Sequence, residues 1–240
     1  MGEKRPPIVK ESPSARLTEE CLDAWPTTIA EARRIQDSLS VGVTISSLRT
    51  PVTTVAGVDA AFSSDKTIAA AVVHDLETMS CIEETYHVAP TSFPYVPGYL
   101  SFREGRALIA ALAGLRRQPD VILVDGQGIA HPRRLGIASF LGVLLAIPTI
   151  GCAKSRLVGE YREPPHGKGS WSELYLAGEI VGAVLRTRDR TNPLFVSPGH
   201  LITLAESLEL VLRCCTRYRL PEPIRHADSL AKRMKRERAA

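Results

Sequence analysis

Residues 121–145 read VILVDGQGIAHPRRLGIASFLGVLL, and this stretch decides the fold class. Residues 121–124 are an uninterrupted apolar run of four, which is typical of a buried central strand. Residues 126–133 are rich in glycine and predict a loop, and residues 134–145 predict a helix. A buried strand that leads through a loop into a helix indicates an α/β protein.

The segments before this stretch add a meander of strands. A helix is predicted through residues 29–39, with Thr18 or Asp23 as its possible start. Three β-prone runs follow, separated by turn residues, and predict a three-stranded meander at 52–62, 67–74 and 81–88. A proline-rich loop at 90–100 (PTSFPYVPGYL) then leads into an amphipathic helix over 102–117, where apolar residues recur at helical spacing.

The segments after it complete the prediction. We expect a short strand at 149–153, an irregular excursion at 159–178, edge strands at 180–186 and 194–196, and a final helix at 200–218. Strands followed by alternating helices and strands predict one α/β domain, a mixed sheet flanked by helices.

Composition and charge exclude several classes of protein. The chain has 240 residues, 44% of them hydrophobic, which excludes a disordered or collagen-like chain. The net charge of +4 is modest, but residues 95–160 hold eight Lys and Arg against four Asp and Glu. A basic block of this kind is the expected footprint of a polyanionic partner, although a solvated surface is the commoner explanation.

The cysteines and the N-terminal segment predict a compartment. Five cysteines without a CxxC pair argue against a disulfide framework and against a thiolate zinc site. The first residues, MGEKRPPIVKESPS, lack the apolar region of a secretory signal, and the apolar run at 140–147 is too short to span a bilayer. We therefore expect a cytoplasmic protein with no membrane partner.

Three carboxylates stand at positions that suggest chemistry. Asp59 interrupts an apolar strand, Asp125 ends the buried strand at 121–124, and Glu104 lies near the start of the helix after the proline-rich loop. A carboxylate at the edge of an apolar sheet is costly unless it is paired, and Mg²⁺ is a fitting partner. Carboxylates that converge from different elements suit metal-assisted phosphodiester hydrolysis. Any one of them alone is more often a capping or turn residue.

The sequence resembles the endonuclease V family. The similarity covers about 170 residues and is carried by six ordered segments: GVDAAF (57–62), PYVPGYLSFREG (94–105), DGQGIAHPRRLGIASFLGVLL (125–145), IPTIGCAKSRLVG (147–159), NPLFVSPGH (192–200) and YRLPEPIRHAD (218–228). The resemblance implies a ribonuclease-H-like fold. It also implies that Asp59, Glu104 and Asp125 bind the metal, with His200 near the metal or the attacking water.

The resemblance assigns substrate-binding roles as well. It implies a wedge that enters the strands beside the lesion, an inosine pocket made largely of backbone, and contacts to the scissile phosphate. The wedge is formed by Tyr95, Val96, Pro97 and Gly98, the pocket by Gly98, Leu100, Gly126 and Ile137, and the phosphate contacts by His131 and Lys154. The family commonly has histidine where this chain has Phe140, so a polar contact of the family is absent here.

The expected activity follows from the family. The resemblance implies a monomeric, Mg²⁺-dependent endonuclease of DNA repair, with Mn²⁺ as a substitute, that recognises deoxyinosine and hydrolyses the second phosphodiester bond 3′ to it, leaving 3′-hydroxyl and 5′-phosphate ends. An inosine-specific endoribonuclease and a lesion-binding module that does not cut remain alternatives. We expect a flexible leader at 1–15, the catalytic domain at 16–228, and a basic, disordered tail at 229–240.

Overall fold

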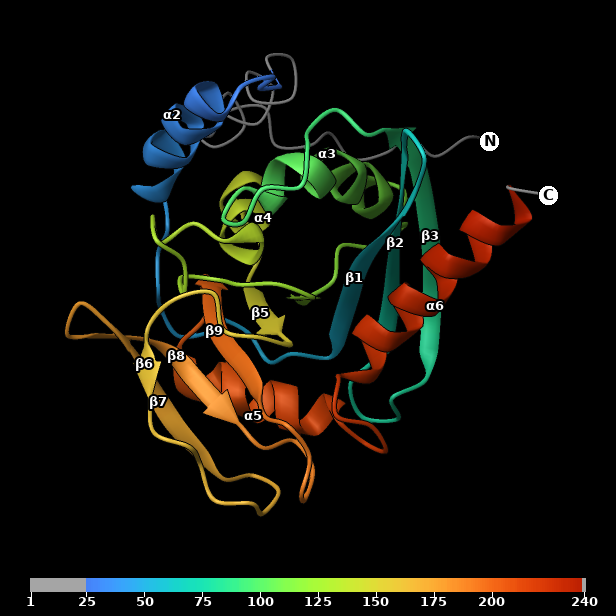
Figure 1. The fold of residues 1–240 in the computed structure, drawn as a ribbon. Helices are drawn as coiled ribbons and strands as arrows, with labels where there is room; N and C mark the ends of the chain where they lie inside the picture. The colour runs from blue at the N-terminus through green and yellow to red at the C-terminus, as the bar shows by residue number, and fades with distance from the viewer. Residues whose placement is uncertain (1–24, 239–240) are drawn as a thin grey trace.

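The protein is built on a single nine-stranded mixed sheet (Figure 1). The structure, a computed structural model, describes residues 25–238, so the expected leader at 1–15, Thr18 and Asp23 lie outside the described residues. The strand order is β3-β2-β1-β4-β5-β9-β8-β7-β6. The strands are β1 (Thr54–Ser63), β2 (Lys66–Asp75), β3 (Cys81–Pro90), β4 (Val121–Val124), β5 (Thr149–Ala153), β6 (Glu160–Tyr161), β7 (Trp171–Leu176), β8 (Glu179–Leu185) and β9 (Leu194–His200).

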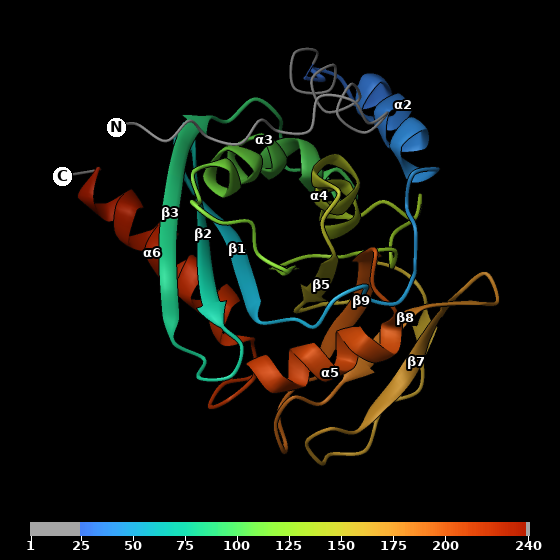
Figure 2. The same cartoon turned by 180° about the vertical axis from the view of Figure 1, so that it is seen from behind.

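Helices cover both faces of the sheet (Figure 2). On one face, α2 (Ile29–Ser40), α3 (Leu100–Ala113) and α4 (Ile137–Leu145) share a core with alternate residues of β1, β2 and β4. On the other face lie α5 (Leu204–Cys214) and α6 (Glu222–Glu237), which pack on the intervening residues of the strands. Capping boxes at Thr28 and Thr203 fix the starts of α2 and α5.

The predicted α/β class and the antiparallel meander of β1, β2 and β3 are confirmed. Two details of the C-terminal half are wrong. Residues 159–178, expected to be irregular, contain β6 and β7, and neither β8 nor β9 is an edge strand. The strand β9 pairs with both β5 and β8, and such long-range pairing leaves no mark in local sequence patterns.

The register between β1 and β4 is held by one carboxylate. Asp120, which precedes β4, accepts hydrogen bonds from the backbone N–H and the hydroxyl of both Thr53 and Thr54, at 2.8–3.0 Å. Burial alone would raise the pKa of Asp120, but these hydrogen bonds lower it. The clamp joins the starts of two parallel strands, so it also fixes which residues meet at their carboxyl ends.

Helix α6 corrects the expectation of a disordered tail. Residues 229–237 continue this helix, which runs diagonally across β1, β2 and β3 (Figure 1). Its apolar stripe, which includes Ile224, Ala227, Leu230 and Ala231, is buried against the sheet, so the basic residues of this segment occupy the other faces of a packed helix. Within the described residues, no helix is both long and apolar enough to cross a membrane.

Candidate active site

Two of the predicted carboxylates lie side by side, Asp59 within β1 and Asp125 directly after the end of β4. Val58 of β1 pairs with Val124 of β4 in parallel register, so Asp59 and Asp125 follow at the same level, on strands about 4.8 Å apart. The position after a parallel strand is where α/β proteins commonly place functional groups. The strand register alone therefore brings these two acids together.

Two helices add a carboxylate each from opposite faces of the sheet. Glu104 belongs to the second turn of α3 and is only 9% exposed. Asp228 belongs to α6, and it lies close enough to Asp59 to contribute to the raised pKa of that carboxyl group. This approach requires Gly57, because a Cβ there would lie 2.0 Å from the carbonyl carbon of Pro223 at the start of α6. Asp228 is a site residue that the sequence analysis missed.

The electrostatics show that these carboxylates share one environment. Burial, followed by the charge of Asp125, raises the pKa of Asp59 to about 7. Burial, followed by the charges of Asp59 and Asp125, raises the pKa of Glu104 to about 8. Both groups are therefore held partly or largely protonated near neutral pH unless a cation balances them.

Lys154 supplies one positive charge to this group. It follows β5, the strand next to β4, and its ammonium group forms an ion pair with Asp125. Burial alone would lower the pKa of Lys154, but the hydrogen bond and the charge of Asp125 raise it. Lys232 of α6 forms a second ion pair, with Asp228, at 2.7 Å, so two ammonium groups face four carboxyl groups at the site.

The donor set fits a divalent cation. Four carboxyl groups offer only oxygen ligands, the type that Mg²⁺ and Mn²⁺ prefer. Within the described part of the chain, the group of histidine, cysteine and acidic side chains whose ligand atoms all lie within 4.8 Å of one another is His74, Cys81 and His226. The carboxylates are spread more widely, which agrees with the mutual repulsion of like charges and leaves space for metal-bound water.

His200 does not join the carboxylates, and its expected place near the metal is wrong. It pairs with Thr149, which in turn pairs with Ile122 at the opposite end of β4 from Asp125. The register places it about 10 Å from Asp125 along the strands and about 10 Å across them. Its Nδ1 atom accepts a hydrogen bond of 3.1 Å from the backbone N–H of Thr44, so its observed contact anchors the segment after α2.

The predicted wedge is an exposed loop that is held at both ends. Tyr95 is 69% exposed, whereas Phe93 at the start of the loop is buried in the core. At the other end, the N–H of Tyr99 donates to the carbonyl of Val96 at 2.9 Å, which closes a turn. Gly98 in that turn has a φ of +81°, a conformation that favours glycine. A loop fixed in this way presents Tyr95 with little loss of entropy on binding.

The carbonyl oxygen of Gly98 is the main anchor of this loop. It accepts hydrogen bonds from His131 Nε2 at 2.9 Å, Gln36 Nε2 at 2.9 Å and Arg133 Nη2 at 3.3 Å. Burial lowers the pKa of His131 to about 4, and its Nδ1 accepts from the N–H of Arg133, so the ring is neutral and Nε2 donates. The observed contact of His131 thus positions the loop, and Gln36 is a second residue that the sequence analysis missed.

The residues predicted for the base pocket lie together. A Cβ on Gly126 would lie 2.4 Å from Cγ2 of Ile137 and 3.9 Å from Cδ2 of Leu100. Gly126 directly follows Asp125, so these three residues lie beside the carboxylates. They present apolar side chains and backbone to this region.

Phe140 occupies an apolar environment. It is fully buried and makes edge-to-face contacts with Trp25 and Phe102, at centroid distances of 6.0 and 5.6 Å. A Cβ on Gly105 would lie 2.9 Å from its ring, so the neighbouring turn of α3 is shaped around this side chain. The surroundings of residue 140 therefore match phenylalanine.

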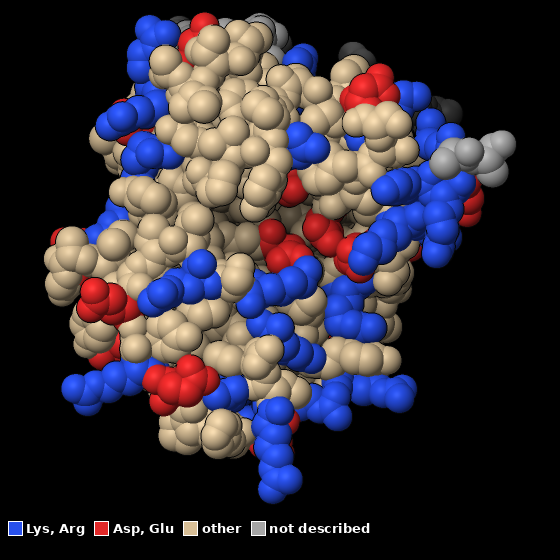
Figure 3. Space-filling view, viewed as in Figure 1, with Lys and Arg blue, Asp and Glu red and all other residues tan. Residues whose placement is uncertain are grey.

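The surface supports a polyanionic ligand. Figure 3 shows a hollow near the middle of one face, with acidic side chains at its base and lysine and arginine side chains around it. The surrounding positive charges attract phosphates. The acidic centre itself would repel phosphates unless a bound cation neutralised it.

Comparison with known proteins identifies the family. A sequence profile of the family described as Endonuclease V matches residues 37–229. Endonuclease V of a Nostoc species is 54% identical over 210 residues, covering 86% of this chain and 95% of that protein. Endonuclease V of a Roseiflexus species is 49% identical over 207 residues, covering 86% and 93%.

Solved structures agree in sequence and in fold. The crystal structure of endonuclease V from Streptomyces avermitilis is 42% identical, with a TM-score of 0.86, and the match covers 91% of this chain and 97% of that chain. The Ciona intestinalis enzyme, crystallised with a 23mer DNA containing an inosine followed by a ribo-adenosine, is 27% identical, with a TM-score of 0.76, and the match covers 87% and 97%. This chain therefore belongs to the endonuclease V family of metal-dependent nucleases, which act on phosphodiester bonds.

Proposed function

We propose that this nuclease recognises deoxyinosine, the product of adenine deamination, in DNA and begins its repair. It hydrolyses the second phosphodiester bond 3′ to the lesion and leaves 3′-hydroxyl and 5′-phosphate ends. The similar Ciona enzyme was crystallised with inosine-containing DNA, which supports this substrate class.

The observation that carries the proposal is the contact between the base pocket and the carboxylates. Gly126 lines the pocket with Ile137 and Leu100, and it is bonded directly to Asp125. Hypoxanthine keeps the O6 and N1–H groups of guanine but lacks the 2-amino group. A tight pocket with a backbone wall can therefore accept hypoxanthine and reject guanine by its shape.

The wedge loop prepares the base for this pocket. An enzyme that binds a base in a pocket must take it out of the helical stack, which costs a few kcal/mol. The exposed Tyr95 ring can replace part of the lost stacking, and the anchored carbonyl of Gly98 holds the loop in place while it does so.

The acidic residues would hold the metal beside the phosphate. Asp59, Asp125 and Asp228, with Glu104 beside them, form the ligand set, and their oxygens favour Mg²⁺, with Mn²⁺ as a substitute. When bound, the metal supplies activation of water and stabilisation of the leaving oxygen. Lys154 is positioned beside Asp125 to bind an oxygen of the scissile phosphate and to neutralise charge that develops on it.

A nicking assay tests the proposal. Matched DNA strands with and without one deoxyinosine are incubated with Mg²⁺, Mn²⁺ or EDTA, and the ends are mapped at single-nucleotide resolution. We expect one nick, at the second bond 3′ to deoxyinosine, with either metal and none with EDTA. Asp125→Asn should abolish the nick, and Glu77→Gln, a similar change at an exposed position, should not. Equal cutting of strands without deoxyinosine would refute the proposed specificity.

An inosine-specific endoribonuclease is the second candidate function. The pocket is lined by backbone and apolar side chains, so its walls do not by themselves test the 2′-hydroxyl group. The same assay with an RNA strand of equal sequence decides between the two substrates. Cleavage of inosine RNA without cleavage of deoxyinosine DNA would assign the enzyme to RNA, and binding without cutting of either would indicate a lesion-binding module. We further propose that the enzyme acts as a monomer in the cytoplasm.

A further inference from the structure

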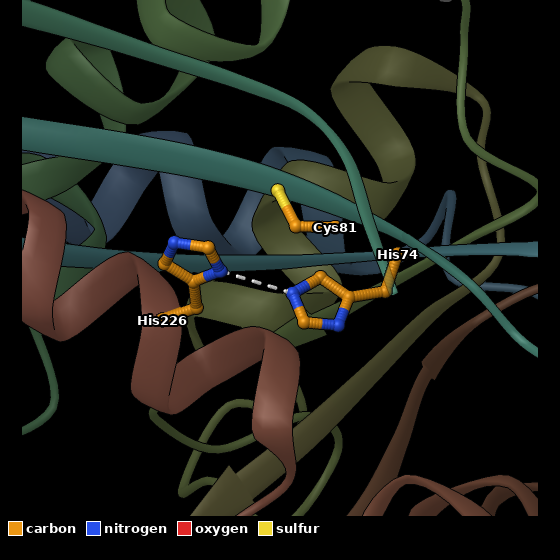
Figure 4. Close-up of side chains that lie close together, drawn as sticks. All are labelled: His74, Cys81 and His226. Carbon is orange, nitrogen blue, oxygen red and sulfur yellow. Dashed lines mark hydrogen bonds between the residues drawn. The ribbon is translucent and has the colours of Figure 1, made fainter. Parts of the chain in front are cut away.

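A second group of metal-ligand side chains lies on the far flank of α6 from the carboxylates. His74 of β2, Cys81 of β3 and His226 of α6 place one ligand atom each within 4.8 Å of the others (Figure 4). We propose that these three side chains form a second metal site, specific for Zn²⁺ or a similar thiophilic ion, which fastens α6 to the β2–β3 hairpin.

The hairpin brings the first two ligands together. His74 and Cys81 are cross-strand partners at an irregularity in the β2–β3 register. The turn between them is braced by Asp75, whose Oδ1 accepts hydrogen bonds from the N–H groups of Glu77 and Thr78 at 3.1 and 2.8 Å. Opposite residues in an antiparallel pair point to the same face, and here that face lies under α6.

The outer sides of both rings face acceptor oxygens. His74 Nδ1 makes a hydrogen bond of 3.1 Å with the carbonyl oxygen of Met79, and His226 Nε2 lies 3.3 Å from a carboxylate oxygen of Glu84. A carbonyl oxygen can only accept, so His74 Nδ1 carries a hydrogen in this contact, and the neighbouring Glu84 carboxylate favours a hydrogen on His226 Nε2. With the hydrogens placed in this way, the remaining nitrogens, His74 Nε2 and His226 Nδ1, face each other with lone pairs.

Those two nitrogens are 3.2 Å apart. Two lone pairs at this distance repel each other unless a proton lies between them. A cation that both nitrogens bind also removes this repulsion. A tetrahedral zinc ion with ordinary bond lengths separates two ligand nitrogens by about 3.3 Å and a nitrogen from a sulfur by about 3.6 Å. The observed nitrogen pair already has this spacing, and the sulfur of the exposed Cys81 lies within 4.8 Å of both nitrogens.

The ligand types of this site select a different metal from the one that the carboxylates bind. Imidazole and thiolate favour zinc, whereas carboxylate oxygens favour Mg²⁺ and Mn²⁺. A histidine ligand whose second nitrogen donates to a carboxylate or a carbonyl is also the usual outer arrangement of zinc sites, and both rings have it here. Three protein ligands leave the fourth position to water.

The site has a structural consequence for the carboxylates. His226 and Asp228 flank the buried Ala227 on opposite sides of α6, so one flank faces the hairpin and the other faces Asp59. A metal bond at His226 would hold the first turns of α6 on the sheet. His226 is thus a positioning residue for Asp228, not a catalytic one.

The test measures metal binding in excess Mg²⁺, which occupies the carboxylates. Full-length protein is stripped with a chelator, reloaded with Zn²⁺ or Co²⁺, and analysed for metal content and for cobalt absorption. We expect one retained equivalent of Zn²⁺, together with a thiolate-to-cobalt charge-transfer band and the strong visible bands of tetrahedral cobalt. Zn²⁺ should also raise the thermal unfolding temperature.

Single substitutions test whether the retained zinc is bound by the three proposed side chains. Cys81→Ser, an exposed and mild change, should remove the charge-transfer band, and His226→Ala should remove the retained equivalent. His87→Ala, a histidine change at an exposed position of β3, should leave both unchanged, and Glu84→Gln should weaken zinc binding about 10- to 100-fold. Absence of retained zinc in the native protein, or a cobalt–thiolate band that survives Cys81→Ser, would overturn the proposal.

Discussion

Glu104 is expected to destabilise the metal-free protein, and replacing it with glutamine should reveal this. The side chain is almost fully buried, and burial with the nearby charges of Asp59 and Asp125 raises its pKa from 4.5 to about 8. In the unfolded chain the same carboxyl group ionises near its ordinary value. Glu104→Gln keeps the size and polarity of the protonated acid and removes the ionisation.

The sign of the effect follows from the two pKa values. Below about pH 4.5, Glu104 is protonated in both states, so its ionisation has no effect on stability. Between pH 4.5 and 8, the unfolded chain releases the proton and the folded protein keeps it, so the folded protein loses stability as the pH rises. Each unit of pKa difference corresponds to about 1.4 kcal/mol, which gives a loss of about 3 kcal/mol at pH 7 and about 5 kcal/mol above pH 8.

Urea unfolding in EDTA, followed from pH 4.5 to 9, measures this difference. The free energy of unfolding of Glu104→Gln should exceed that of the native protein by an amount that grows across this range, and Glu77→Gln should follow the native curve. Mg²⁺ should stabilise the native protein and have less effect on the variant, which should also be inactive. Parallel pH curves for the native protein and Glu104→Gln would refute the raised pKa and the electrostatic strain inferred from it.

Three further predictions concern the site and its support. Asp228→Asn should leave the fold intact by circular dichroism and reduce nicking at least about 100-fold, because the ligand set loses a charge; near-native activity would exclude Asp228 from that set. Gly126→Ala should weaken binding of inosine-containing DNA, measured by fluorescence anisotropy, because the new Cβ would lie 2.4 Å from Ile137; unchanged affinity would mean that the base does not enter there. Asp120→Ala should lower the free energy of unfolding by about 1 to 2 kcal/mol, because the exposed Thr53 and the partly buried Thr54 lose their shared acceptor; a change under about 0.3 kcal/mol would mean that the clamp is not needed.

The elements that the sequence predicts well are those whose pattern lies within a few consecutive residues. The apolar run of β4 and the three β-prone runs of the meander, with the turn residues between them, are signals that span only a few residues, and the predicted boundaries are close to those observed. The strands β6 and β7 are short and partly exposed, so they have weak periodicity and were expected to be irregular. The tail was judged by its charge, whereas its small apolar stripe packs on the sheet and makes it a helix.

The residues of the site also differ in whether the sequence alone predicts them. Asp59 and Asp125 are recognisable because an acid within or at the end of an apolar strand needs a partner. Asp228 is absent from the predicted site although it ends the last of the matching segments, 218–228. That segment also holds Glu222, so an acidic residue there does not by itself stand out in the sequence. The family resemblance implies a place near the metal for His200, but strand register places it beside Thr149, at the opposite end of β4 from Asp125.

By itself, the sequence determined the α/β class and the family, and it predicted three of the four grouped carboxylates and the residues proposed for the wedge and the pocket. Only the tertiary structure decided that Asp228 completes the acidic group, that His131 braces the loop, and that His74, Cys81 and His226 meet without any CxxC spacing. The physical reason is that such meetings depend on strand register and on the path of a helix across a sheet. Those are set by distant contacts, such as the Asp120 clamp and the close approach of α6 to Gly57, which no local pattern records.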